Sequence, residues 1–127
     1  MTPAENKALR ESMGLTLKWL AIRWGVTVQS VKRWEGSRTP PPQIAKDMLD
    51  LKRKFDADVQ RLVENGGEVV EVPRRDRDCT GSEQSAAWAR AVAQRAKEQM
   101  GLTIVFRDTE GMEKNGNKAI YKESKMV

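Results

Sequence analysis

The side chains most able to do chemistry in this chain lie in the segment TVQSVKRW, residues 27–34. The amide of Gln29 can hydrogen-bond adenine through two atoms, the guanidinium of Arg33 can do the same to guanine, and the methyl groups of Val28 can touch thymine. Each contact is made to the edge of a base in the major groove of double-stranded DNA. The segment therefore predicts a surface that reads DNA, provided that one rigid element presents these side chains together.

A short helix is the element that these residues require. Residues 25–27 (GVT) supply a sharp turn, an apolar plug and a helix cap in succession, which predicts a helix over residues 28–35. Val31 and Trp34 are three positions apart and can pack inward from it. The side chains expected to face outward toward DNA are Val28, Gln29, Ser30, Lys32 and Arg33.

Two more helices are predicted before this one. Thr2 is followed three residues later by a glutamate, which is the spacing of a capping box, and Pro3 suits the first helical position. The first helix should run to about Met13, where Gly14 can adopt the left-handed conformation that ends a helix. Thr16 can cap a second short helix, whose inward stripe is Leu17, Leu20, Ala21 and Trp24.

A longer amphipathic helix is predicted after the proline-rich loop at residues 36–42. It runs to Glu64, where Asn65 and two glycines end it, and at roughly 1.5 Å per residue it would be about 30 Å long. Its apolar side chains recur three or four positions apart, as one helical stripe requires: Ile44, Met48, Leu51, Phe55, Val59 and Leu62.

The remaining sequence predicts a small β-α-β region. Strands are expected over residues 68–73 and over residues 102–106 (LTIVF). Between them, Ser82 is expected to cap a helix that Gly101 ends. This helix carries the apolar stripe Trp88, Val92, Ala96 and Met100.

The predicted fold class is α+β, with two small units. An all-α domain of four to five helices covers residues 1–64 and includes the long helix, and a small α/β dimerisation region covers residues 65–127. In the second unit, Asn115 and Gly116 are expected to turn a hairpin that returns through residues 118–121.

Residues 16–35 have the composition of a helix-turn-helix. In that motif the second helix lies in a groove about 12 Å wide, while the first helix bridges to the DNA backbone. Ala21 is small enough to let the next helix approach, Gly25 makes the turn, and Val31 fills the space between the two helices.

Residues 5–52 resemble the phage Cro and repressor superfamily of XRE-like helix-turn-helix proteins. The resemblance implies that Val28, Gln29 and Arg33 contact bases. The layout of the whole chain is also similar to that of the anti-CRISPR-associated repressors of phages, which are dimeric autoregulators. The positions that carry the first resemblance are Leu9-Arg10, Gly14-Leu15-Thr16, Leu20-Ala21, Gly25-Val26-Thr27, Val31-Lys32-Arg33-Trp34-Glu35-Gly36 and Pro40.

The same resemblance implies an ion pair between Arg10 and Glu35, and contacts to the DNA backbone. One departure is Leu17, because many members of the superfamily have there a glutamine that holds a phosphate. Thr16 and Lys18 are expected to take over that contact. The predicted backbone contacts are Thr16, Lys18, Thr27, Ser30, Lys32, Ser37, Arg38 and Thr39.

Composition argues against several other classes of function. The 127-residue chain has no histidine and one cysteine, Cys79, so it lacks the usual zinc ligands, an intrachain disulfide and the commonest general base. It has no glycine-rich phosphate loop, and we expect no enzyme, no metal site and no cofactor. No stretch approaches the roughly 20 apolar residues of a membrane span, and a signal peptide is lacking, so a soluble, cytoplasmic protein is expected.

Charge and core size predict the partners. The net charge is +5, and residues 1–52 hold nine Lys or Arg against five Asp or Glu, which places the polyanion-binding half first. Residues 65–127 contain few large apolar side chains, so a second copy would complete their core. The predicted partners are double-stranded DNA and a second identical chain, with no membrane.

The predicted function is regulation of transcription by a homodimeric repressor that binds an inverted-repeat operator. The main alternative is a DNA-binding antitoxin, whose C-terminal region would neutralise a partner toxin. A protein-interaction module that has kept the fold without binding DNA is a further alternative.

Several other residues have simpler interpretations. Trp24 and Trp34 are expected in the core, whereas Trp19 could cover the first helix or face a partner. The arginines at positions 74–77 alternate with aspartates, which is typical of a solvated loop, with a second DNA contact as the alternative. Cys79 is expected to be a surface thiol without a role.

Overall fold

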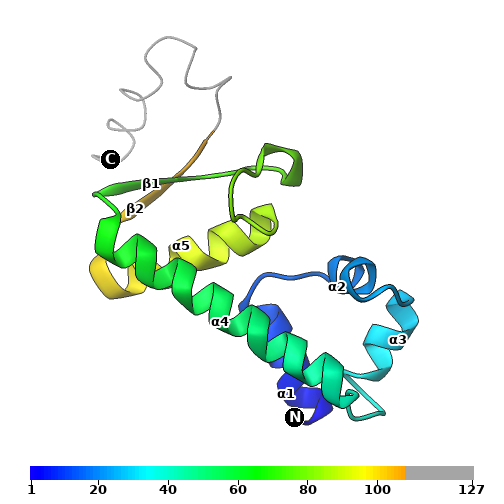
Figure 1. Ribbon diagram of the computed structural model, residues 1–127. Coiled ribbons are helices and arrows are strands. Elements are labelled where there is room, and N and C mark those ends of the chain that lie inside the picture. The colour runs from blue at the N-terminus through cyan, green and yellow to red at the C-terminus, as the bar shows by residue number, and fades with distance from the viewer. Residues whose placement is uncertain (108–127) are drawn as a thin grey trace.

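The computed structural model describes residues 1–107. The fold is mixed and rich in helix, with a small parallel sheet of two strands, in agreement with the predicted α+β class. The hairpin expected beyond Asn115 lies outside the described residues. In chain order the elements are α1 (Pro3–Ser12), α2 (Leu17–Trp24), α3 (Val28–Arg33), α4 (Pro42–Asn65), β1 (Val69–Val72), the 3-10 turn η1 (Asp76–Asp78), α5 (Ala86–Met100) and β2 (Thr103–Phe106) (Figure 1).

The first three helices begin at the threonines that were predicted to cap them. Thr2 and Glu5 exchange two hydrogen bonds in a complete capping box at the start of α1. The hydroxyl oxygens of Thr16 and Thr27 accept from the backbone N–H three residues later, at 3.0 and 3.1 Å. Gly25 has a φ of 66°, the left-handed conformation that makes the turn between α2 and α3 sharp.

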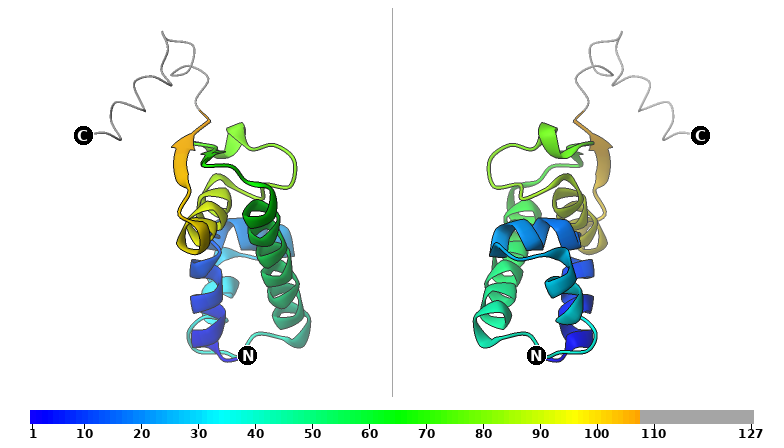
Figure 2. Two further views of the ribbon diagram at one scale, coloured as in Figure 1. Left: turned by 90° about the vertical axis from the view of Figure 1, so that its left-hand side faces the viewer. Right: turned by 90° about the vertical axis from the view of Figure 1, so that its right-hand side faces the viewer.

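Helix α4 is the longest element and packs against both halves of the chain. Its first half lies alongside α1, and its second half packs on α5 (Figure 2). Within residues 1–107, no helix is long and apolar enough to cross a membrane. The buried side chains of α4 come from the predicted stripe: Ile44, Met48, Leu51, Phe55 and Val59.

Strands β1 and β2 form the predicted β-α-β unit with α5. The strands are parallel, with Val69 opposite Thr103 and Val72 opposite Phe106. Helix α5 connects them and packs on both. It ends at Gly101, as predicted, in the left-handed conformation.

The predicted start of α5 is wrong, because Ser85 caps this helix and Ser82 does not. Ser85 Oγ accepts the N–H of Trp88 at 3.0 Å. The residue before the cap is held outside the helix, since the indole N–H of Trp19 donates to the carbonyl of Gln84 at 3.1 Å. Because Trp19 is 65 residues away from Gln84 in the sequence, the local sequence around Ser82 and Ser85 could not predict this bond.

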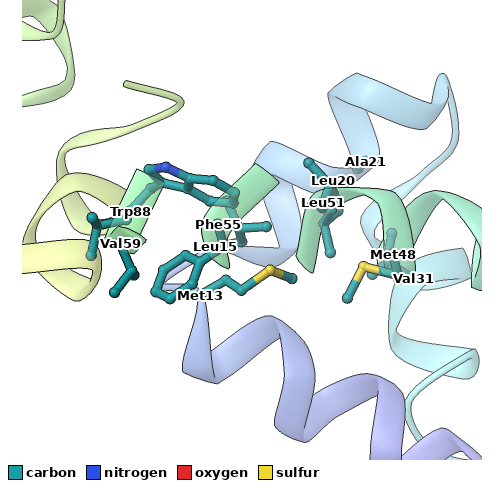
Figure 3. Packing of buried hydrophobic residues seen from close by; sticks show 11 residues of the cluster. Met13, Leu15, Leu20, Ala21, Val31, Met48, Leu51, Phe55, Val59 and Trp88 are labelled. Atoms are coloured by element: carbon teal, nitrogen blue, oxygen red, sulfur yellow. The ribbon is translucent and has the colours of Figure 1, made fainter. Parts of the chain in front are cut away.

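One hydrophobic core runs through both predicted units (Figure 3). Phe55 of α4 and Trp88 of α5 pack edge to face, with ring centroids 5.1 Å apart. Met13 and Leu15, from the link between α1 and α2, belong to the same cluster. The indole N–H of Trp88 donates to Asp58 at 3.0 Å. The two predicted units, residues 1–64 and the described part of residues 65–127, therefore share one core, and α4 lies between them.

Gly14 brings the link between α1 and α2 against the backbone of α5. Its φ is +71°, and a Cβ added there would lie 2.5 Å from the carbonyl oxygen of Ala87. Glycine adopts a positive φ without steric cost and leaves room for this close approach. The link is thereby docked on the first turn of α5.

We expect Gly14→Ala to destabilise the fold more than Gly101→Ala. Both glycines are left-handed, with φ of +71° and +72°, so each alanine carries a backbone cost of about 1–2 kcal/mol. A Cβ at Gly101 meets nothing within 4 Å, whereas one at Gly14 collides with Ala87 and should cost a further ~1–3 kcal/mol. Urea unfolding of the two variants measures the difference, and equal losses would contradict the docking of Gly14 on α5.

Candidate nucleic-acid interface

The predicted base-reading residues lie together on the outer side of α3. Val31 is fully buried (0% exposed) and anchors the helix in the same cluster as Ala21 of α2. Val28 is 37% exposed, and Gln29 and Arg33 are exposed too. One short helix thus presents an amide, a guanidinium and a branched methyl group to solvent, the three groups that can distinguish base edges.

Thr27 and Ser30 both have a structural task at the start of α3. Thr27 Oγ1 accepts the N–H of Ser30 and also lies 3.1 Å from Ser30 Oγ. This contact uses one of the two hydroxyl protons, so one proton remains for an outside acceptor. Thr27 is exposed and Ser30 half-buried, which makes Thr27 the more accessible of the two predicted backbone contacts.

The loop after α3 is tied to the end of that helix. The backbone N–H of Arg38 donates to the carbonyl of Arg33 at 2.8 Å, which turns the chain and ends α3 before the predicted residue 35. Pro40 is buried at the far end of the loop. The side chains between, Ser37, Arg38 and Thr39, are exposed.

The start of α2 contributes the remaining predicted contacts. Thr16 and Lys18 are exposed, and the Thr16 hydroxyl, which accepts the N–H of Trp19, still has its own proton to donate. Leu17 is half-buried and packs against the core cluster. The polar side chains available at this end of α2 therefore belong to Thr16 and Lys18, on either side of Leu17.

The charge on this part of the molecule is strongly one-sided. Residues 16–40 contain one carboxylate, Glu35, whose side chain is only 6% exposed. Arg23 is paired with Asp47 of α4. Among residues 1–107, no carboxylate lies within ion-pairing distance of the other four cations, which are Lys18, Lys32, Arg33 and Arg38.

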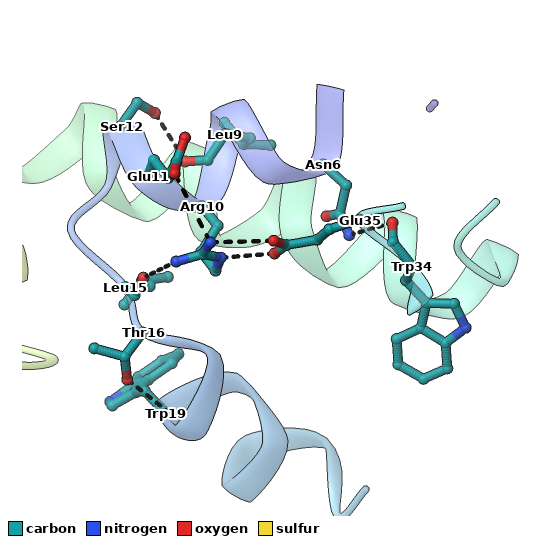
Figure 4. A network of polar contacts seen from close by, with 10 residues as sticks. All are labelled: Asn6, Leu9, Arg10, Glu11, Ser12, Leu15, Thr16, Trp19, Trp34 and Glu35. Carbon is teal, nitrogen blue, oxygen red and sulfur yellow. Dashed lines mark hydrogen bonds and ion pairs between the residues drawn. The ribbon is translucent and has the colours of Figure 1, made fainter. Parts of the chain in front are cut away.

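A partly buried ion pair holds α1 against the end of α3 (Figure 4). Arg10 Nε and a terminal nitrogen donate to the two oxygens of Glu35, at 2.6 and 3.1 Å. The other terminal nitrogen of Arg10 donates to the carbonyl of Leu15 at 2.9 Å. Asn6 of α1, which is fully buried, donates to the carbonyl of Trp34 at 3.1 Å. The pairing that the resemblance implied between Arg10 and Glu35 is therefore confirmed.

A second polar cluster fixes the end of α2 on α4. Asp47 accepts from Arg23 at 2.7 and 3.0 Å and from the indole N–H of Trp24 at 2.7 Å. The hydrogen bonds from Arg23, and after them that from Trp24, hold the pKa of Asp47 below its usual range although partial burial opposes the shift. No local pattern in the sequence marks Asp47, because its partners lie more than twenty residues away.

The tryptophans differ from the expectation of simple core positions. Trp24 and Trp34 are half-buried and contact each other edge to face, with centroids 6.0 Å apart. Trp19 is half-buried as well, and it covers the loop before α5 through its bond to Gln84.

Cys79 is half-buried, and this burial raises the pKa of its thiol.

No protein-family model matches this chain, and no curated protein matches it in sequence. The geometry described above therefore carries the functional argument by itself.

Asp47→Asn should weaken the fold near neutral pH and much less in acid. Because the pKa of Asp47 is lower in the folded chain than its ordinary 3.8, the ionised carboxylate stabilises the fold above that value. This contribution is lost as the pH falls through the folded pKa. The loss of unfolding free energy caused by the substitution should therefore shrink between about pH 7 and about pH 3.

Asp56→Asn is the matched control, since it removes an exposed carboxylate of α4 whose one ion pair within residues 1–107 is with Lys52. Chemical denaturation of both variants and the parent protein across this pH range makes the comparison. A deficit of Asp47→Asn that stays constant with pH would show that its carboxylate charge does not stabilise the fold.

Proposed function

We propose that this chain is a sequence-specific DNA-binding regulator of transcription, in which α2, the turn at Gly25 and α3 act as a helix-turn-helix. Helix α3 enters the major groove, and the start of α2 and the loop after α3 hold the phosphates on either side. The protein acts by occupying an operator in the cytoplasm and excluding the polymerase from it, which is the mechanism of a repressor.

The observation that carries this proposal is the uncompensated positive charge around α3. Lys32 and Arg33 on the helix, with Lys18 before it and Arg38 after it, are exposed and have no carboxylate partner in the described part of the chain. Cations held in this way bind phosphates by displacing the counterions of DNA. They also raise the rate at which a polyanion finds the surface.

The exposed side chains divide into two roles. Gln29 suits adenine and Arg33 suits guanine, each through two hydrogen bonds, and the methyl groups of Val28 suit thymine. The remaining polar groups fix the register on the duplex through its backbone. These backbone contacts are Thr16, Lys18, Thr27, Ser30, Lys32, Ser37, Arg38 and Thr39.

The active form in this proposal is a homodimer joined through the C-terminal unit. Within residues 1–107, β1 and β2 pair only with each other, so each strand keeps an open edge. Val69, in β1, is 47% exposed, and Met100, at the end of α5, is 40% exposed. Open strand edges beside exposed apolar side chains favour pairing with a second copy. The dimer would place two α3 helices on an inverted repeat.

Two substitutions separate the roles within the interface. Gln29→Ala should lose about 1–3 kcal/mol of binding free energy on the cognate duplex and little on random DNA. Arg38→Ala should weaken binding to both duplexes. It should also reduce the slope of log K against log salt concentration by about one for each half-site. Fluorescence anisotropy with labelled duplexes, over a range of salt concentrations, measures these quantities.

The cognate duplex is obtained first, by selection of bound sequences from a random pool. Failure to enrich any sequence, together with no salt-dependent binding to duplex DNA, would refute the proposed function. Equal losses on cognate and random DNA for Gln29→Ala would show that Gln29 does not recognise a base, and would leave the rest of the proposal standing.

The homodimer is tested on its own, without DNA. Sedimentation of the full chain at micromolar concentration should give twice the chain mass of 14.4 kDa. Val69→Lys, which places a charge on the open edge, should shift the equilibrium toward the monomer. Lys46→Ala, on the exposed side of α4, is the control and should leave it unchanged. A monomer at this concentration would contradict the dimer.

A further inference from the structure

We infer that the loop between β1 and α5, with Arg77 at its turn, is a further DNA-binding site that contacts phosphates beyond those reached from α2 and α3. This inference rests on the proposed function and extends it to the C-terminal unit. The ligand is the phosphate backbone of the same duplex, and the contact would not depend on base sequence.

The loop between β1 and α5 is held beside α2. Trp19 at the start of α2 donates its indole N–H to Gln84, so the loop is fastened directly beside the end of α2 that carries Lys18. Gly14, just before α2, is docked on Ala87 of α5. In Figure 1 the loop and α2 lie on the same side of α4. A duplex that lies along α2 and α3 therefore has this loop at its flank.

The three carboxylates of the loop all accept hydrogen bonds from groups of the protein. Asp76 accepts the backbone N–H of Ala86 at 2.8 Å, and Asp78 accepts from Arg75 at 3.1 Å. Each of these carboxylates is bonded to a donor of the protein itself. Glu83, the third carboxylate of the loop, is bonded in the same way, with Arg107 as its partner at 2.7 Å.

Arg77 is the exception among these charged groups. It is exposed on η1, and the described part of the chain gives its guanidinium no hydrogen bond and no ion pair. The loop, residues 73–85, contains three arginines and three acidic side chains. Its carboxylates accept from N–H groups of the loop, of α5 and of Arg107, whereas the guanidinium of Arg77 faces solvent. That arrangement favours an anion, and phosphate is the anion that lies beside α2 when DNA is bound.

Arg77→Ala tests this site through the salt dependence of binding. With a single phosphate contact removed per half-site, the slope of log K against log salt should fall by about one per half-site. Affinity for cognate and random duplexes should fall by the same factor, because the contact carries no base information. Arg77→Lys keeps the charge and should keep most of the slope.

Arg53→Ala is the control for long-range charge. It removes one positive charge from an exposed position on α4, where Asp50 already pairs with it, and should leave the slope unchanged. Ethylation interference adds a map of the contacts: Arg77→Ala should relieve interference at phosphates that Arg38→Ala leaves untouched.

The outcomes separate this inference from the proposed function. If the parent protein binds its selected duplex while Arg77→Ala matches Arg53→Ala in slope and in the ethylation map, the loop is not a DNA contact. If Arg77→Ala loses affinity on the cognate duplex alone, the residue reads bases and the inference of a backbone contact is overturned. If the parent protein binds no duplex, the proposed function itself has failed, and this inference fails with it.

Discussion

The partly buried ion pair between Arg10 and Glu35 is the contact on which the arrangement of the first three helices depends. It joins α1 to the chain just after α3 by two hydrogen bonds, while the same guanidinium holds the carbonyl of Leu15 before α2. A charge that is largely shielded from solvent and loses its partner is destabilising, so the pair fixes these segments in one geometry. It also withdraws Glu35, the one carboxylate of residues 16–40, from the surface. A structural contact thereby leaves cations as the exposed charged groups of residues 16–40.

Local patterns predicted most of the helices, and long-range contacts explain what they missed. The threonine caps, the glycine at position 25 and the apolar stripe of α4 act on neighbours within a few residues, so they can be read from the sequence. Ser82 and Ser85 are equivalent by that standard, and bonds from outside the helix separate them: that of Trp19 to Gln84 and that of Ala86 to Asp76. Asp47 was missed for the same reason, since its bonds to Arg23 and Trp24 cross between helices. The predicted base-reading side chains did come together, because three positions on one short helix need no tertiary information.

The shared core changes how the C-terminal unit relates to the first three helices. Trp88 packs in one cluster with Met13 and Leu15, and Gly14 touches the backbone of α5. Helix α2 is consequently positioned from both sides, by α1 through Arg10 and by the C-terminal unit through Trp19. The start of α2 is therefore packed against the C-terminal unit by groups that cannot move without disturbing the shared core.

The cations of α4 and those around α3 differ in their partners, and this difference supports the proposal that the surface around α3 binds DNA. On α4, most cations have acidic partners three or four residues away, as in Lys46 with Asp50 and Lys52 with Asp56, and within the described residues Lys54 is the exception. Around α3, Lys32, Arg33 and Arg38 form no ion pair with any described residue, because the nearby Glu35 is bonded to Arg10, and their mutual repulsion costs the isolated protein some stability. Helix α3 is only six residues long, too short to be stable alone, and its cap, Val31 and the bond from Arg38 to Arg33 hold it in place. Rigid support for a like-charged surface favours tight binding of a polyanion in the proposed function, because the cations are ordered before the partner arrives.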